Sequence, residues 1–597
     1  FEYQSQLPSL PVPALEATVA KYVENARLFL SPQELERTRQ EAERFLQGPG
    51  PVLQQKLLER ADLKKKENKS WLIDWWNSWA YMDYKDSVVI NVSYAFNFVE
   101  PRLGRVSQTR RAAQLIHGAV LFEQQLHKYT PPLPDMGKDG PMCMNMYQLM
   151  FNTTRIPSAK TDHWATYHDD PEARRKVLVA HKNRFFIVDV YDQSNQLLSV
   201  PELEMQLEKV KSLGSTKEEW AVGVLTSDNR VQWAEARDLL LRDQQNRASL
   251  QQIEKTLFGV CLDEGAKSGL ELERNFWHAD GKNRFFDKSF QFIVMEDGLA
   301  GLNGEHSGVD GSPAWRMTNF VLDWEEEFQR NPEHAANKNR NSAALSPVEA
   351  SFNITDDVKP YITNAEKRLA KAASEVDLQV KYFNKFGKDA IKSWKISPDA
   401  FCQMAMQLAV HSLTGEIYPT YESGQTRKFL WGRTETVRSV SAESVEFVKS
   451  MKRTDLKDSD KLELLRKACN RHTQTNQDAC DGLGIDRHLL GLRLIAAEQG
   501  VEEPGLYKDP AYSRISTWRL STSQLTSPHF QVVFGPVAED GIGCCYGILD
   551  NGLHFKASTA LKCKTNATAF VNAVEDSLVQ MAKICATGTT HASKAKL

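Results

Sequence analysis

Apolar and polar positions in the first part of the chain follow the spacing of helices, after a proline-rich start. Residues 7–13 contain three prolines, and proline removes an amide donor and restricts the residue before it, so this segment is predicted to be extended. Ser31 and Glu34 then have the spacing of a capping box, with Pro32 at the first helical position. We expect a helix that ends at Gly48.

Four tryptophans follow this helix. Trp71, Trp75, Trp76 and Trp79 lie three or four positions apart, which puts most of them on one face of a helix. We expect them to pack in the core.

Strand patterns begin at about residue 176. The segments 177–180 and 184–190 are rich in β-branched and aromatic residues, which is typical of strands. Because helical segments continue between such strands, the class is mixed α and β. The polar stretch 329–346 indicates an exposed loop or linker, so a domain boundary near Phe352 is expected.

A histidine follows a pair of predicted strands. Residues 290–294 form the first strand, 296–298 a turn, and extended structure resumes at Leu299 and leads to His306 in a loop of small residues. Asp310 comes four residues later, where its carboxylate can influence the imidazole or the architecture of the loop. A histidine in such an accessible loop is a candidate general base.

Two further segments carry candidate binding groups. Residues 520–524 have the pattern of a strand. Alternation along a strand puts the hydroxyls of Ser521 and Ser523 on one face, where they can donate hydrogen bonds to a carboxylate or an oxyanion. Lys388 and Lys392 are four residues apart. On one helical face they can hold a phosphate, although solvated lysines are common on surfaces.

Composition narrows the classes of protein. At 597 residues the chain is long enough for two to four domains of roughly 150 residues. The net charge of -3 gives no global basic field, which makes nucleic acid an unsuitable partner. Nine scattered cysteines fit a reducing compartment and no zinc pattern, so no metal is expected. No apolar run approaches a membrane span, which leaves at most peripheral membrane association.

The two ends suggest destinations. The chain ends Ala595-Lys596-Leu597, a conservative variant of the Ser-Lys-Leu signal, and the peroxisomal import receptor is therefore an expected partner. It begins at Phe1 without an initiator methionine. A removed transit peptide is one interpretation, so the mitochondrial matrix stays a second expected location.

Ordered blocks lie along nearly the whole chain: LPSLPVPALEATVAKYV near the start, RFFDKSF at 284–290, EHSGVDG at 305–311, GRTETVRS at 432–439, DRHLLGL at 486–492 and STSQ at 521–524. Together they resemble the carnitine/choline acyltransferase family. The blocks FGKDAIKSWKISPDAFCQMAMQLA and VVFGPVAEDGIGCCY resemble its carnitine acetyltransferase branch most. One departure is Asp310, where a glutamate is usual in the acetyl-transferring enzymes.

The resemblance implies an α/β fold of two chloramphenicol-acetyltransferase-like domains, each with a mixed sheet and flanking helices, that face each other across an active-site tunnel. Residues 63–354 would form the N-terminal domain with the catalytic histidine. Residues 1–62 would cross over to join 355–597 in the C-terminal domain, which would carry most contacts to coenzyme A (CoA) and carnitine.

The resemblance also implies roles for individual residues. The catalytic set would be His306, Ser523 and Asp310, the CoA contacts Lys388, Lys392 and Asp399, and the substrate contacts Tyr421, Thr434, Arg487, Ser521, Phe534 and Val532. Val532 aligns with a methionine of the acetyl enzymes and a glycine of the octanoyl enzymes, which implies short chains with some medium-chain activity. A register shift of one residue would give this position to Val533.

The implied activity is the reversible transfer of a short acyl group between CoA and the carnitine hydroxyl, within fatty acid metabolism. Carnitine and acyl-CoA would be the small-molecule partners, with acetyl-CoA a co-substrate and no tightly bound cofactor. The alternatives left open are a medium-chain carnitine acyltransferase, a choline acetyltransferase, and a non-catalytic protein that binds acyl-CoA or acylcarnitine.

Overall fold

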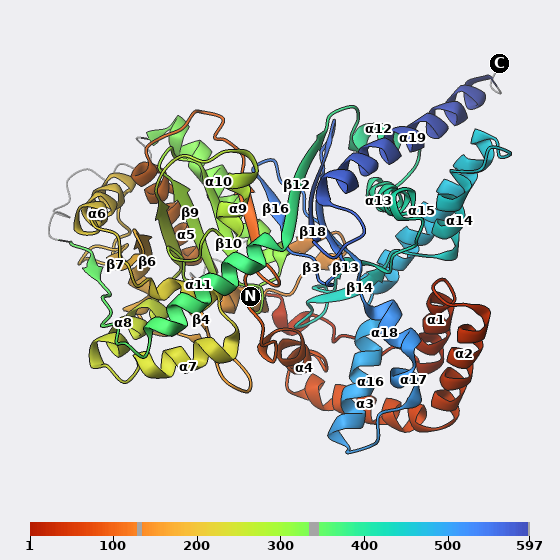
Figure 1. Ribbon diagram of the computed structural model, residues 1–597, viewed down its shortest axis with the longest axis horizontal. Helices are drawn as coiled ribbons and strands as arrows, with labels where there is room; N and C mark the ends of the chain where they lie inside the picture. The colour runs from red at the N-terminus through yellow and green to blue at the C-terminus, as the bar shows by residue number, and fades with distance from the viewer. Residues whose placement is uncertain (128–133, 333–344, 595–597) are drawn as a thin grey trace.

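The computed structural model describes residues 1–127, 134–332 and 345–594 of the chain. Two mixed β-sheets lie side by side, each flanked by helices (Figure 1). The mixed α/β class expected from the sequence is confirmed, as are the two mixed sheets with flanking helices.

The first sheet has eight strands, in the order β11 (Val348–Glu349), β7 (Arg184–Asp189), β6 (Lys176–His181), β8 (Gly259–Asp263), β9 (Phe290–Met295), β10 (Ala300–Gly304), β1 (Tyr94–Phe98) and β16 (Phe530–Val533). Strands β6, β8 and β9 are parallel, and the other pairs are antiparallel. Strand β16 comes from the C-terminal part of the chain and completes the edge next to β1 (Figure 1).

Both faces of the first sheet are buried. Its strands have apolar residues at consecutive positions, and consecutive side chains point to opposite faces. In β6, Val177 and Val179 pack into one cluster and Leu178 and Ala180 into another. Helices of the first cluster are α5 (Gln108–His127), α6 (Val200–Leu213) and α10 (Gly311–Arg330). Helices of the second are α7 (Arg230–Leu240), α8 (Gln244–Lys255), α9 (Gly269–Trp277) and α11 (Lys359–Ser374).

The second sheet has six strands, in the order β12 (Val376–Phe383), β18 (Leu553–Ala560), β17 (Ile542–Ile548), β15 (Leu520–Gln524), β13 (Thr420–Gln425) and β14 (Thr434–Arg438). Its helices are α12 (Lys388–Ser393), α13 (Pro398–Thr414), α14 (Ala442–Ser450), α15 (Asp458–Cys480) and α19 (Ala567–Lys594). Cys544 faces these helices and Cys545 faces the core of the first sheet. The two halves of the molecule therefore meet along this sheet.

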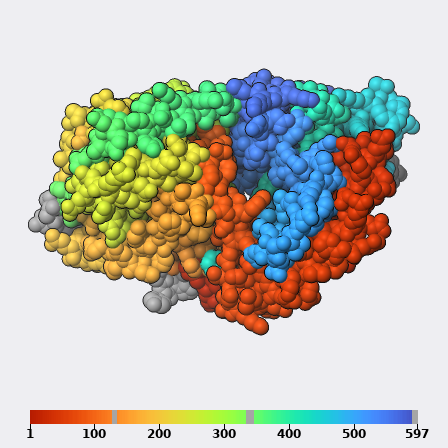
Figure 2. Space-filling model, turned by 60° about the horizontal axis from the view of Figure 1, so that its bottom comes forward, coloured from red at the N-terminus to blue at the C-terminus, as the bar shows by residue number. Residues whose placement is uncertain are grey.

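The N-terminal helices pack against helices from the far end of the sequence. One apolar cluster joins α1 (Leu15–Ala26), α2 (Pro32–Gln47) and α3 (Pro49–Lys66) to α16 (Asp486–Glu498), α17 (Gly505–Lys508) and α18 (Pro510–Ser516). Figure 2 shows the two segments side by side, the first in red and the second in blue. This packing is in keeping with a crossover of the first 62 residues, and the division into 63–354 and 1–62 with 355–597 stays a prediction.

Several local predictions are confirmed. Helix α2 starts at a complete capping box between Ser31 and Glu34, and the strands expected at 177–180 and 184–190 are β6 and β7. Most of the predicted loop 329–346 lies outside the described residues. No helix among the described residues is long and apolar enough to span a membrane.

The tryptophan prediction holds only in part. Trp71 and Trp76 are buried, whereas Trp79 is 53% exposed. Helix α4 (Ile73–Asn77) gives way to a π-helical turn, Ser78–Met82. The regular α-helical spacing on which the prediction depended therefore ends before Trp79.

The remaining elements are short. They are β2 (Met136–Gly137), β3 (Gly140–Pro141), β4 (Thr153–Ile156), β5 (His163–Thr166) and the 3₁₀ turns Gln4–Gln6, Asn145–Leu149, Ala173–Arg175 and Val222–Ser227.

Candidate active site

His306 lies in the loop between strand β10 and helix α10, as the sequence predicted. Its ring stacks on Tyr81 at a centroid distance of 5.4 Å and meets the edge of Tyr94 at 5.3 Å. The Nδ1 atom lies 3.5 Å from the Tyr81 hydroxyl. The side chain is still 31% exposed, so the imidazole is held between aromatic walls and remains accessible.

Arg433 holds the loop that carries His306. Its Nη2 donates to the His306 carbonyl at 3.1 Å and its Nη1 to the Ser307 carbonyl at 2.6 Å. The same guanidinium binds Asp310 through Nη2 at 2.7 Å and Nε at 3.1 Å. Since Asp310 is also the N-cap residue of α10, one arginine fixes both ends of the loop.

Burial sets the charge state of His306. Loss of hydration lowers the pKa of the imidazole below its usual value, while the nearby Asp310 carboxylate opposes the shift and Arg433 reinforces it. Arg433 also keeps Asp310 ionised: burial alone would raise the pKa of that carboxyl, but the charge and the hydrogen bonds of Arg433, with smaller contributions from His306 and Arg427, lower it. His306 is therefore neutral near pH 7, the state that a general base requires.

A second group of buried side chains supports the loop from the other side. Glu305 accepts hydrogen bonds from the Ser307 hydroxyl and from Arg155 Nη1, the latter at 3.2 Å. Arg155 also donates to the Tyr81 carbonyl at 2.7 Å, and Trp164 donates to the Ser307 hydroxyl at 2.9 Å. These contacts fix the loop and the Tyr81 wall together.

Arg487, near the start of helix α16, lies beside strand β14. Its guanidinium donates to the Thr434 carbonyl at 3.1 Å, the Thr434 hydroxyl at 3.4 Å and the Thr436 hydroxyl at 3.3 Å, and it stacks 3.7 Å above the Trp76 ring. Every acceptor that this side chain uses among the described residues is neutral. A buried arginine without a carboxylate partner is suited to bind an anionic group.

A row of side chains connects this arginine to the histidine. Arg487 covers Trp76, the Trp76 ring meets Tyr81 edge-on at 6.2 Å, and Tyr81 stacks on His306. A run of packed side chains therefore links the predicted base to the predicted anion-binding arginine.

Strands β13 and β15 bring the serines and a tyrosine together. Tyr421 and Ser521 are paired in register. The Thr522 hydroxyl donates to the Tyr421 carbonyl at 2.8 Å and accepts from Gln403 of helix α13 at 2.9 Å, so Thr522 faces the helices. Ser521 and Ser523 lie on the opposite face of the strand, as the alternation predicted.

The two lysines lie on the short helix α12. Lys388 forms an ion pair with Asp550 at 2.5 Å, which raises the pKa of its ammonium group. Lys392 is exposed one turn later. The shared helical face that the sequence required is present.

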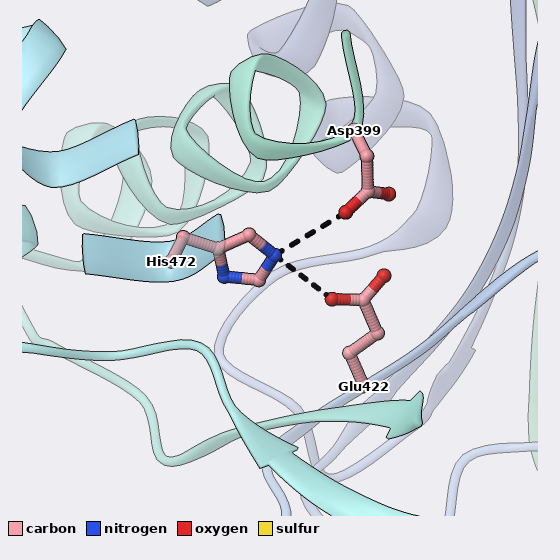
Figure 3. A group of neighbouring side chains, drawn as sticks. All are labelled: Asp399, Glu422 and His472. Carbon is pink, nitrogen blue, oxygen red and sulfur yellow. Dashed lines mark hydrogen bonds and ion pairs between the residues drawn. The ribbon is translucent and has the colours of Figure 1, made fainter. Parts of the chain in front are cut away.

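Asp399 belongs to a cluster of charged side chains (Figure 3). His472 Nε2 lies 3.3 Å from an oxygen of Asp399 and 3.0 Å from one of Glu422. Among the described residues this is the one group in which three potential metal-ligating side chains converge. Both carboxyl groups lie within ion-pair distance of His472 Nε2, whereas Nδ1 of the same ring has no hydrogen-bond partner among the described residues. The sequence did not indicate this cluster.

Val532 and Phe534 lie at the junction of the two sheets. Val532 is opposite Phe96 of strand β1 and is 3% exposed. Phe534 follows strand β16, and its carbonyl accepts a hydrogen bond from the Ser558 hydroxyl at 2.7 Å. Val533, the alternative in the predicted register, packs into the opposite cluster of the first sheet.

Comparison with known proteins gives the family. The model of the Choline/Carnitine O-acyltransferase family matches residues 10–576. This chain belongs to that family. It is 37% identical to the carnitine O-acetyltransferase of Columba livia, with 97% of this chain and 93% of that protein covered. It is 35% identical to the mitochondrial carnitine O-acetyltransferase of Saccharomyces cerevisiae (93% and 84% covered), and 32% to the choline O-acetyltransferase of Danio rerio (97% and 93%).

Family membership confirms the resemblance that the sequence blocks carried. The structure brings His306 near Asp310, and Arg487 near Thr434, and the roles of these residues stay predictions. Residues that the sequence did not single out are Arg433, Glu305 and Thr436. Arg433 and Thr436 lie within two positions of the predicted site residue Thr434 in the GRTETVRS block. Their place in that block was the one feature of the sequence that could have marked them as site residues.

Proposed function

We propose that this protein transfers a short acyl group reversibly between CoA and the hydroxyl of carnitine, with His306 as general base and without an acyl-enzyme. The observation that carries the proposal is the row from His306 through Tyr81 and Trp76 to Arg487. It pairs an accessible neutral base with an arginine whose acceptors among the described residues are all neutral. An acceptor with both a hydroxyl and a carboxylate fits this pair.

The base acts at Nε2, because Nδ1 faces the Tyr81 hydroxyl and Asp310. Nε2 removes the proton of the carnitine hydroxyl as that oxygen attacks the thioester carbonyl. The tetrahedral intermediate then collapses, the C–S bond breaks, and the imidazolium returns its proton to the CoA sulfur. A base in this position contributes a factor of about 10² to 10⁴ in rate.

The oxyanion of the intermediate needs a donor on the side of strand β15. Ser523 lies on the strand face away from the helices, together with Ser521, and we assign the donor role to Ser523. One such donor contributes about 3 kcal/mol to transition-state stabilisation. Ser521 and Tyr421 would border the acceptor.

CoA would lie along helices α12 and α13. Lys388 and Lys392 would bind its phosphates, and Asp399 a hydrogen-bond donor elsewhere in the cofactor. Lys388 already has Asp550 as an ion-pair partner, so a phosphate has to compete with that carboxylate, whereas Lys392 is exposed.

The acceptor is carnitine and not choline. Carnitine's carboxylate loses its hydration in the site and needs a compensating charge, which Arg487 supplies with the Thr434 hydroxyl. Choline has no carboxylate and would leave the guanidinium hydrogen-bonded only to the neutral threonine groups. The chain is similar to enzymes named for each acceptor, so this arginine is the deciding feature.

For localisation we propose the peroxisome, the mitochondrial matrix, or both. One relative is named as mitochondrial. The terminal Ala595-Lys596-Leu597, which would bind the peroxisomal import receptor, lies outside the described residues.

A thiol-release assay tests the proposed function. Acetyl-, butyryl- and octanoyl-CoA are each mixed with the purified protein and with carnitine or choline, and the free CoA thiol is followed by a thiol reagent. We expect release with carnitine, fastest for the short chains. Release with choline alone, or none with either acceptor, would overturn the proposal.

A further inference from the structure

Four side chains from four elements, three of them buried, meet near the start of helix α13. They are Asp399 of α13, Glu422 of β13, His472 of α15 and Tyr546 of β17. The side chains of Glu422 and His472 are 3% and 1% exposed, whereas that of Asp399 is 29% exposed. Asp399 is thus the one ionisable member of the cluster that can touch a ligand.

The hydroxyl of Tyr546 fixes where the protons are. It lies 2.6 Å from Asp399 Oδ1, 2.8 Å from Glu422 Oε1 and 2.9 Å from Gln403 Nε2. The amide of Gln403 only donates, so the hydroxyl accepts from it and has one proton to give to one carboxylate. The other carboxyl must therefore be protonated, so that it donates its own hydrogen bond to the Tyr546 oxygen.

Burial selects Glu422 as the protonated member. Loss of hydration and the charge of Asp399 raise the pKa of the Glu422 carboxyl. Burial alone would raise the pKa of Asp399, but the hydrogen bond and charge of His472, together with the hydrogen bonds of Tyr546 and Glu422, lower it and keep the carboxyl ionised. With an imidazolium at His472, whose pKa is raised by its two carboxyl neighbours against its burial, the cluster has no net charge.

The donors around Asp399 also fix its direction. His472 of helix α15 holds Oδ2, and Tyr546 of strand β17 holds Oδ1 (Figure 3 shows the first contact). Gln403 ties Tyr546 to Thr522, which in turn binds the Tyr421 carbonyl. Rotation of the carboxylate would therefore break its hydrogen bonds to helix α15 and strand β17.

We propose that His472, Glu422 and Tyr546 are positioning residues that hold the Asp399 carboxylate ready for a hydrogen-bond donor of CoA. This inference rests on the proposed function, because CoA is its ligand. A carboxylate repels phosphate groups, so its partner is an amide N–H, hydroxyl or amino group of CoA, while the lysines of α12 serve the phosphates. His472 and Glu422 do not touch the ligand and act only through Asp399.

Calorimetric titration of CoA and, separately, of carnitine into full-length variants tests the proposal. His472→Gln and Tyr546→Phe should each weaken CoA binding about tenfold, because an aligned hydrogen bond to a charged group is lost. Carnitine binding should stay within about twofold of the wild type, since a general loosening would affect both ligands. His163→Gln, at an exposed histidine of strand β5, is the matched control.

Two further variants keep the outcome decisive. Asp399→Asn should weaken CoA binding at least as much as His472→Gln, and Glu422→Gln should leave it unchanged because glutamine reproduces a protonated glutamate. If Asp399→Asn matters and both His472→Gln and Tyr546→Phe do not, the positioning role is wrong. If Glu422→Gln weakens binding as strongly as His472→Gln, the proton arrangement is wrong. Failure of the wild type to bind CoA at all would instead overturn the proposed function.

Discussion

The Arg433 guanidinium binds both carboxylate oxygens of Asp310, at 2.7 and 3.1 Å, whereas His306 Nδ1 lies 3.5 Å from the nearer oxygen. The strong partner of Asp310 is therefore the arginine. The carboxylate neutralises a buried guanidinium that also holds the carbonyls of His306 and Ser307. We infer that Asp310 contributes to catalysis mainly through the position of the loop.

Asp310→Asn should destabilise the protein by about 3–5 kcal/mol, because it leaves the buried Arg433 without its counter-charge. Its effect on kcat should be smaller than that of removing the histidine. Asp310→Glu, which retains the charge, is the control. Denaturant unfolding and initial rates measure the two effects. A kcat loss as large as that of His306→Ala, with unchanged stability, would make Asp310 a direct participant.

Arg487→Asn should raise the KM for carnitine about a hundredfold, since a carboxylate that is buried without its ionic partner loses roughly 2–5 kcal/mol. The KM for acetyl-CoA should change little. Steady-state kinetics with each substrate varied in turn measures both constants. Equal increases for the two substrates would count against the assignment of Arg487 to the carnitine carboxylate.

Val532 is predicted to limit the length of the acyl chain. It is buried opposite Phe96 at the junction of the sheets, and each methylene that fits there adds about 0.8 kcal/mol of burial. Val532→Met should depress butyryl and hexanoyl transfer and spare acetyl transfer, and Val532→Gly should extend the range toward octanoyl. Val533→Met is the matched control for the register. Wild-type chain-length profiles in both Val532 variants would remove this residue from the acyl pocket.

The buried Glu435 carboxyl makes the free energy of unfolding of the protein depend on pH. Burial raises the pKa of its carboxyl to about 7 from the ordinary value of 4.5, with Arg487 opposing and Asp486 adding to the shift. Because the folded pKa lies above the unfolded one, the folded state binds the proton more tightly. The resulting stability is present below about pH 4.5 and is lost as the pH rises to 7, a change of about 3 kcal/mol.

Glu435→Gln removes this dependence. Its melting temperature relative to the wild type should therefore rise between pH 5 and pH 8, measured by thermal unfolding at each pH. Glu219→Gln, at an exposed glutamate, should show no such trend. A constant difference between Glu435→Gln and the wild type would mean that Glu435 is already ionised at pH 5.

Local sequence patterns predicted the elements that present the site. The capping box at Ser31, the paired strands before His306 and the alternation around Ser523 all depend on residues a few positions apart. Such short-range signals specify where a helix or strand starts and which face a side chain takes. They do not specify what lies opposite that face.

The contacts that set the chemistry come from distant parts of the chain. Arg433 reaches the His306 carbonyl across 127 positions, and strand β16 pairs with β1 from the other end of the sequence. Periodicity carries no information about such pairings. Buried polar residues without a local partner, such as Arg433 and Glu422, become interpretable only when the fold supplies their neighbours.

The measurement that tests the central claim most directly is the rate of acetyl transfer to carnitine by His306→Ala, with CoA and carnitine binding measured on the same protein. The imidazole is proposed to move a proton and to anchor neither substrate. We predict a loss of about 10² to 10⁴ in kcat with both dissociation constants near those of the wild type. A variant that retains more than about a tenth of the wild-type kcat would contradict the assignment of His306 as the base.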